Sequence, residues 1–102
     1  MTIYHGIHGH DVPGTVTANN RPLCPRHDLA RHADHLGWRH PDCALQLSLA
    51  ILAHHCGSDE QRALDFCEAY RDRVVIHLPP VWVLDSDEIE VTLVALAAGV
   101  AA

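Results

Sequence analysis

Lysine is absent from this chain of 102 residues. Seven arginines stand against 13 aspartates and glutamates, so the formal net charge is -6 with histidine counted as neutral. A protein that binds duplex nucleic acid directly usually needs a basic face that releases counterions from the phosphates. The composition therefore argues against a direct nucleic-acid partner and favours a protein partner with a basic surface.

Long apolar runs are also missing, and no signal peptide is visible in the sequence. The longest nearly apolar stretch, residues 91–102, is far shorter than the ~20 residues that cross a bilayer. The first residues do not show a basic region followed by an apolar segment, as a signal peptide would. The four cysteines form no Cys-x-x-Cys pair, which argues against a disulfide-rich secreted domain. We expect a reduced, cytoplasmic protein that does not span a membrane.

Catalytic motifs are scarce. The chain has no glycine-rich phosphate loop, and two of its three serines lie where helix caps are expected. A small enzyme with a Cys/His site is the alternative, in which Cys56 would act with His54, His55 or His77. Nothing in the sequence around Cys56 activates its thiol. We therefore expect a protein without enzymatic activity.

The strongest pattern in the chain is CALQLSLAILAHHC, residues 43–56, where apolar residues recur at helical spacing around most of the helix. It predicts a buried central helix with Asp42 as its N-cap and Gly57 as its end. Ser58 and Gln61 form a capping box that predicts a second helix, antiparallel to the first.

Extended segments and loops surround this helical pair. The sequence predicts a hairpin at residues 2–18 and a long polar loop with one helical turn at 23–41. A strand ended by two prolines follows at 73–78, and then a brief extended segment at 81–84. The last predicted element is a helix at 87–98, capped by Asp85 or Ser86. A strand over 87–98 is the alternative to that helix. One domain, residues 1–102, accounts for the length. The expected fold is α+β, a small antiparallel sheet packed on a central helix with an antiparallel helical hairpin, in the order ββ–loop–αα–β–α.

Several segments between residues 37 and 89 resemble a family of small proteins of unknown function that is frequent in phages and mobile elements. They are ALQLSLAIL at 44–52, GSDEQRAL at 57–64, RVVIHLP at 73–79, and Trp82 with the acids before Ile89. Tyr4-His-Gly and the segment with Gly37–Trp38 match more loosely. The glycine-rich tract that the family carries after the tryptophan is replaced here by RHPDC. The resemblance implies a phage-like α+β domain and no particular reaction.

Two short motifs in the long loop suggest a metal site. Cys24-Pro-Arg-His27 and His40-Pro-Asp-Cys43 are separated by 12 residues. Two cysteines and two histidines are an ordinary tetrahedral set for zinc. The pattern supports a second hypothesis, a zinc-stabilised structural or adaptor domain. With ten histidines in the chain, pairs of this kind also arise by chance.

The negative charge lies in the C-terminal part of the chain, where residues 59–102 hold nine acids and three arginines. The predicted second helix carries an acidic face that would suit a basic protein surface, formed by Asp59, Glu60, Asp65, Glu68 and Asp72. Trp38 beside Arg39 is either an interface anchor or a cover for the core.

Size, charge and resemblance together lead to one leading hypothesis. The chain is expected to be a non-enzymatic phage or mobile-element protein that binds a protein partner stoichiometrically. An anti-CRISPR-like inhibitor of a host defence complex is the concrete form of this hypothesis. The limited core of so small a domain also favours a homodimer.

Overall fold

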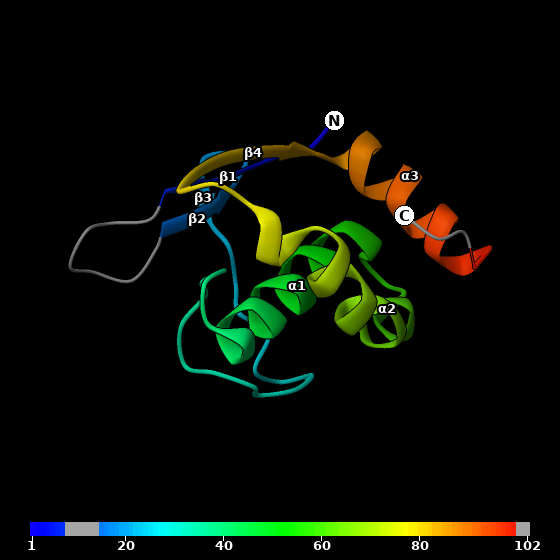
Figure 1. Ribbon diagram of the computed structural model, residues 1–102, viewed down its shortest axis with the longest axis horizontal. Helices are drawn as coiled ribbons and strands as arrows, with labels where there is room; N and C mark the ends of the chain where they lie inside the picture. The colour runs from blue at the N-terminus through cyan, green and yellow to red at the C-terminus, as the bar shows by residue number, and fades with distance from the viewer. Residues whose placement is uncertain (8–14, 100–102) are drawn as a thin grey trace.

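The computed structural model describes residues 1–7 and 15–99 and confirms the α+β class. A four-stranded antiparallel sheet forms one layer, and helices lie against one of its faces (Figure 1). The strands are β1 (Ile3–Ile7), β2 (Thr15–Ala18), β3 (Arg21–Pro22) and β4 (Val81–Asp85), in the order β3-β2-β1-β4. The sheet therefore joins the first strand of the chain to a strand near its C-terminal end.

The central helix α1 (Pro41–Cys56) is the core of the molecule, because every residue from Ala44 to Ala53 is buried. Its predicted N-cap, Asp42, is wrong. His40 caps the helix, accepting a hydrogen bond from the Asp42 N–H, and Pro41 takes the first helical position. Proline suits that position, because it has no N–H to leave unpaired. The predicted end at Gly57 is confirmed.

The second helix, α2 (Glu60–Arg73), packs against α1. The Ser48 hydroxyl of α1 donates a hydrogen bond of 2.6 Å to the Cys67 carbonyl of α2. The predicted capping box at Ser58 and Gln61 is wrong. Asp59 is the N-cap, and its carboxylate accepts from the Arg62 N–H.

The strand predicted at 73–78 is not formed. Helix α2 continues to Arg73, and the residues Val75–His77 form a single 3₁₀ turn. The β-branched run reads as a strand locally, but Val75 is fully buried in the core, and tertiary packing overrides the local propensity. The strand that joins the sheet is β4, which pairs with β1 from Ile3↔Asp85 to Ile7↔Val81.

The predicted hairpin is confirmed as the antiparallel pair β1–β2, although its turn lies outside the described residues. The last helix is also confirmed. It is α3 (Ser86–Ala97), and the Asp85 side chain caps it by accepting from the Glu88 N–H. No described helix is long and apolar enough to cross a membrane.

The inner face of the sheet packs closely on the helices. Trp82 on β4 lies over Gly6 on β1, where an added Cβ would sit 2.2 Å from the indole ring. Trp38 meets Trp82 edge to face, with ring centroids 5.8 Å apart. Glycine at position 6 is therefore required for the tryptophan pair to close the core between sheet and loop.

Gln46 on α1 fixes the long loop against the helix. This fully buried amide accepts from the N–H groups of His32 and Ala33 and donates to the carbonyls of Pro25 and Ala30. All four hydrogen-bonding positions of the amide are used. The polar loop is thus held by one side chain of the buried helix.

We expect Gln46→Met to lower the free energy of unfolding by about 2–4 kcal/mol, because it leaves four loop backbone groups without their partner. The matched control is Gln61→Met on the exposed side of α2, which should change stability by less than about 0.5 kcal/mol. Urea unfolding measures both. Equal, small effects for the two variants would show that the Gln46 amide does not anchor the loop.

Candidate functional site

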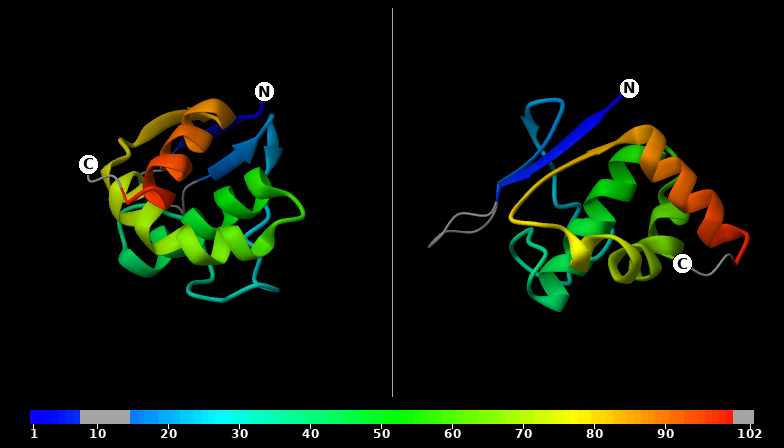
Figure 2. Two further views of the ribbon diagram at one scale, coloured as in Figure 1. Left: turned by 90° about the vertical axis from the view of Figure 1, so that its right-hand side faces the viewer. Right: turned by 45° about the horizontal axis from the view of Figure 1, so that its top comes forward.

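The outer face of the sheet is a broad exposed surface that the helices do not cover (Figure 2, right). Strand alternation sends to this face the side chains of Ile3, His5, Ile7, Thr15, Thr17, Val81, Val83 and Asp85. Its aliphatic members are large and accessible, with Ile7 at 47%, Val81 at 56% and Val83 at 57% exposure. Ile7 lies opposite Val81 in the register, so these apolar side chains are neighbours.

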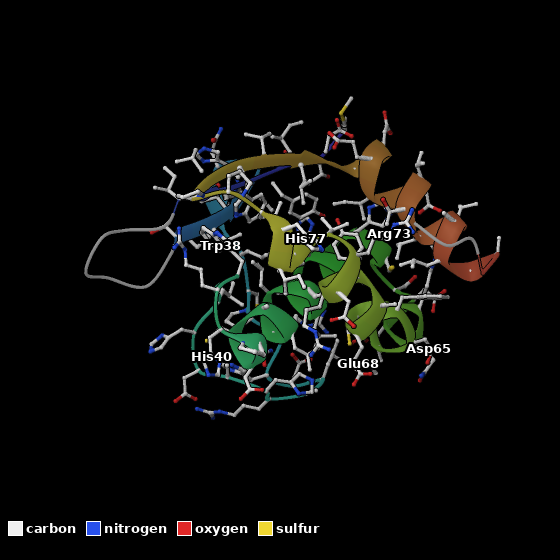
Figure 3. The ribbon with its side chains drawn as sticks, in the orientation of Figure 1. Trp38, His40, Asp65, Glu68, Arg73 and His77 are labelled. Carbon is white, nitrogen blue, oxygen red and sulfur yellow. The ribbon has the colours of Figure 1, made fainter. Side chains whose placement is uncertain are left out.

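The second surface is the solvent side of α2, where Asp65, Glu68 and Asp72 follow one another at helical spacing and are all exposed. Figure 3 shows Asp65 and Glu68 on the side of α2 that is turned away from the sheet. Asp65 accepts from the Gln61 amide, and Asp72 pairs with Arg71 at 2.9 Å. These three residues form the acidic side of α2.

The five acids expected to form one acidic face have different roles in the structure. Asp59 is the α2 cap, and Glu60 pairs with Arg26 of the long loop at 2.5 Å. Both side chains therefore serve the fold. Among the described residues, only Asp65 and Glu68 of the five acids form neither an ion pair nor a helix cap.

Trp38 is 2% exposed and packs in the core. It therefore covers the core and does not project from the loop as an interface anchor. Arg39 beside it is exposed. The sequence could not separate the two roles, because the position of Trp38 depends on Gly6 and Trp82, which are far away in the chain.

The residues of the expected zinc site are not gathered by the structure. The described parts of the chain contain no group of three or more His, Cys, Asp or Glu residues placed to hold a metal. His27 contacts the Ala33 carbonyl through Nε2, and His40 caps α1 through Nδ1. Cys24 is exposed, whereas Cys43 is partly buried. Elemental analysis of untagged protein tests the zinc hypothesis independently of these positions.

The candidate Cys/His site lacks an activated thiol. Burial raises the pKa of Cys56, and the carboxylates of Asp59 and Glu90 act in the same direction, while Arg62 opposes them. The neighbouring histidines are engaged elsewhere, because His54 bonds to the Tyr4 hydroxyl and His55 to Glu90, both at 2.8 Å. A nucleophilic cysteine needs a lowered pKa, and this arrangement does the opposite.

A pocket of about 570 Å³ lies at the turn between β2 and β3, and no sequence pattern predicts it. It is lined by Ala18, Asn19, Arg21, Pro22, Cys24 and His54. His54 of this lining bonds to the Tyr4 hydroxyl at 2.8 Å, and burial raises the pKa of Tyr4 to about 12. The lining residues include one histidine, one cysteine and one arginine.

An ionic cluster ties the three helices together. Arg62 on α2 makes a two-pronged ion pair with Glu90 on α3, at 2.9 and 2.8 Å, and His55 on α1 meets the same carboxylate at 2.8 Å. Arg62, followed by His55, lowers the pKa of Glu90 to about 2. Sequence spacing does not show this cluster, since its members are far apart in the chain.

These features define a two-layer α+β domain with an uncovered sheet face and an acidic helix. The model of the family of unknown function DUF6166 matches residues 4–95, and the chain belongs to this family. The match runs from β1 to within α3, and so extends the resemblance noted over residues 37–89. No curated protein and no solved structure matches the chain.

We expect the Glu90 cluster to stabilise the protein at neutral pH and to weaken in acid. Because the pKa of Glu90 falls from its ordinary value of 4.5 to about 2 on folding, its contribution is complete above about pH 4.5 and is lost as the pH approaches 2. The carboxylate is 44% exposed, so solvent screening limits the effect to about 1 kcal/mol or less.

Urea unfolding of wild type and Glu90→Gln across this pH range measures the effect. The stability difference should be largest near neutral pH and should shrink below pH 4.5. Asp65→Asn is the control, since this acid forms no ion pair among the described residues. A Glu90→Gln difference that stays constant down to pH 3 would contradict the assigned pairing.

Proposed function

We propose that the protein acts without catalysis, by binding another protein in fixed stoichiometry through the outer face of its sheet. The observation that carries this proposal is the group of exposed aliphatic side chains, Ile7, Val81 and Val83, on neighbouring strands. Single exposed apolar residues are normal on protein surfaces, but contiguous apolar patches mark interaction sites. The polar neighbours His5, Thr15 and Thr17 resemble the mixed composition of non-obligate interfaces.

The acidic side of α2 supports a partner with a basic surface. Asp65 and Glu68 are exposed and carry no ion pair within the described residues, so their charge is available to a partner. The overall charge of -6 adds a long-range attraction to a basic protein. Such charges act mainly on the association rate and on the choice of partner.

The concrete form of the proposal is a phage or mobile-element protein that inhibits a host defence complex, as anti-CRISPR proteins do. Its small size and negative charge support this form, because the groove that binds nucleic acid in such a complex is basic. The four unpaired cysteines support action in the reducing cytoplasm. The chain itself would not contact nucleic acid.

The outer face is tested with Ile3→Thr/Ile7→Thr, which removes apolar contact area from β1 and keeps residues that suit a strand. The matched control is Val91→Thr/Val94→Thr, which makes a similar change at exposed valines of α3, away from the sheet. Affinity capture from host extract with quantitative mass spectrometry compares both variants with wild type. We expect one partner, recovered in fixed ratio with wild type and control, to fall at least tenfold with the β1 variant.

Two results would contradict the proposal. Equal recovery of the partner with the β1 variant would remove the sheet face as the contact surface. A small-molecule or nucleic-acid substrate that purified protein turns over catalytically would remove the non-enzymatic function.

The acidic side of α2 is tested separately with Asp65→Lys/Glu68→Lys, leaving Glu60 in place because its reversal would break the internal pair with Arg26. With a partner that has a basic surface, this variant should associate more slowly than wild type at low salt, and the difference should narrow as salt rises. The neutral variant Asp65→Asn/Glu68→Gln should be intermediate. A salt-independent association rate shared by all three proteins would exclude a basic partner at α2.

The inhibitory form is tested by titrating the protein into DNA cleavage by purified CRISPR effector complexes. Inhibition that saturates at equimolar protein supports it. Undiminished cleavage by the effectors of the same host, in excess protein, overturns it.

A further inference from the structure

The two edges of the sheet differ in how they are protected. At one edge, β3 has only two residues, Arg21 and Pro22, and combines a charge with a proline. Short, charged and proline-containing edge strands are the devices that prevent pairing with another chain. The opposite edge is β4, five residues long, with the sequence VWVLD and no proline within it. Only one edge of this sheet is therefore closed to a further strand.

The hydrogen-bond pattern shows which groups of β4 face its open edge. Ser86 N–H donates to the Thr2 carbonyl at 2.9 Å, directly after the pair Ile3↔Asp85. In an antiparallel ladder, residues alternate between directing their backbone groups toward one neighbour and toward the other side. Trp82 and Leu84 therefore bond to β1, whereas the N–H and C=O groups of Val81 and Val83 point away from the sheet.

We propose that a second copy of this chain pairs antiparallel with β4, so that two molecules form a homodimer with one continuous sheet across a two-fold axis at Val83. Each Val83 exchanges two backbone hydrogen bonds with the Val83 of the other copy. At each end, the Asp85 N–H donates to the Val81 carbonyl of the other copy. The Asp85 carbonyl does not take part, because an N-cap residue uses it to begin its own helix.

This register is fixed at both ends of the strand. Pro79 and Pro80 precede Val81 and have no N–H to donate, so the pairing cannot slide in that direction. A shift the other way would bring the two Asp85 carboxylates toward each other, which like charges disfavour. With the axis at Val83, each Asp85 lies beside a valine and the two Val83 side chains pack together.

The self-pairing register of β4 assigns this edge to a second copy, and the charge distribution does not oppose it. The acidic side of α2 lies in the helical layer, on the other side of the sheet from the exposed aliphatic residues (Figure 1). Edge pairing therefore joins two chains of charge -6 without placing their acidic helices face to face. The exposed Val81 and Val83 of both copies then form one apolar band on the outer face of the joined sheet.

The pairing of five residues buries less than the roughly 1,200 Å² of a standard stable interface. We therefore expect a dimer that dissociates in the micromolar range. Sedimentation equilibrium of the full chain over a wide concentration range tests this, with the weight-average mass expected to rise from that of one chain toward that of two.

Val83→Lys places two like charges opposite each other at the axis and should leave the protein monomeric at every concentration. The matched control is Thr17→Lys, which adds the same charge in the same row of the outer face, two strands away from the open edge. It should dimerise as wild type does, and circular dichroism checks that both variants are folded.

Hydrogen exchange provides the second readout. The Val83 amide should exchange more slowly as protein concentration rises, whereas the amides that bond β4 to β1 should not change. A wild type that stays monomeric at the highest concentration, with a fast-exchanging Val83 amide, overturns the proposal and leaves the edge to a strand of another protein. Dimerisation of Val83→Lys with wild-type affinity overturns it as well. Neither result tests partner binding by the outer face, which is tested separately at Ile3 and Ile7 on the central strand β1.

Discussion

The middle of α1, from Ala44 to Ala53, is buried on every side, and the packing of the other elements follows from this burial. A helix with no solvent-facing stripe must be covered all round, and here the sheet, α2 and the loop between β3 and α1 each cover part of it. The two polar side chains within its buried stretch, Gln46 and Ser48, bond to two of these covers. Burial and hydrogen bonding thus act together to place loop and helix against α1.

This constraint also explains what remains exposed. Two of the helices and the long loop lie on the inner side of the sheet, and α3 is joined to the helices through Glu90. None of these elements is left to cover the outer face, where Ile7, Val81 and Val83 stay accessible. The bare face and the open β4 edge are therefore two results of the same arrangement. A domain built in this way can meet a partner without rearranging its core.

The parts of the fold that could be predicted from the sequence are those that local spacing determines. The apolar pattern of 43–56 predicts the buried helix, and Asp85 is one of the two caps that the sequence offers for the last helix. The failures have long-range causes. Residues 73–78 have strand propensity, but β1 pairs with β4, and Val75 packs in the core. The caps His40 and Asp59 were each missed by one or two residues.

The candidate sites likewise include features that local spacing predicts and features that depend on long-range contacts. Helical spacing correctly grouped Asp65, Glu68 and Asp72, but it could not show that Glu60 pairs with Arg26, 34 residues away. The outer-face patch was missed because it needs the register between β1 and β4, which no local pattern contains. The His-x-x-Cys spacing of residues 40–43 suggested metal ligands, while the structure uses His40 as a helix cap.

The elements that cover α1 leave the outer face of the sheet exposed. Methyl NMR with a soluble paramagnetic agent measures this directly on dilute protein, because the agent broadens only the methyl signals that solvent reaches. We expect strong broadening for Ile3, Ile7, Val81 and Val83 and almost none for Leu47, Leu49 and Ile51 of α1. Outer-face methyls as protected as those of α1 would contradict this expectation.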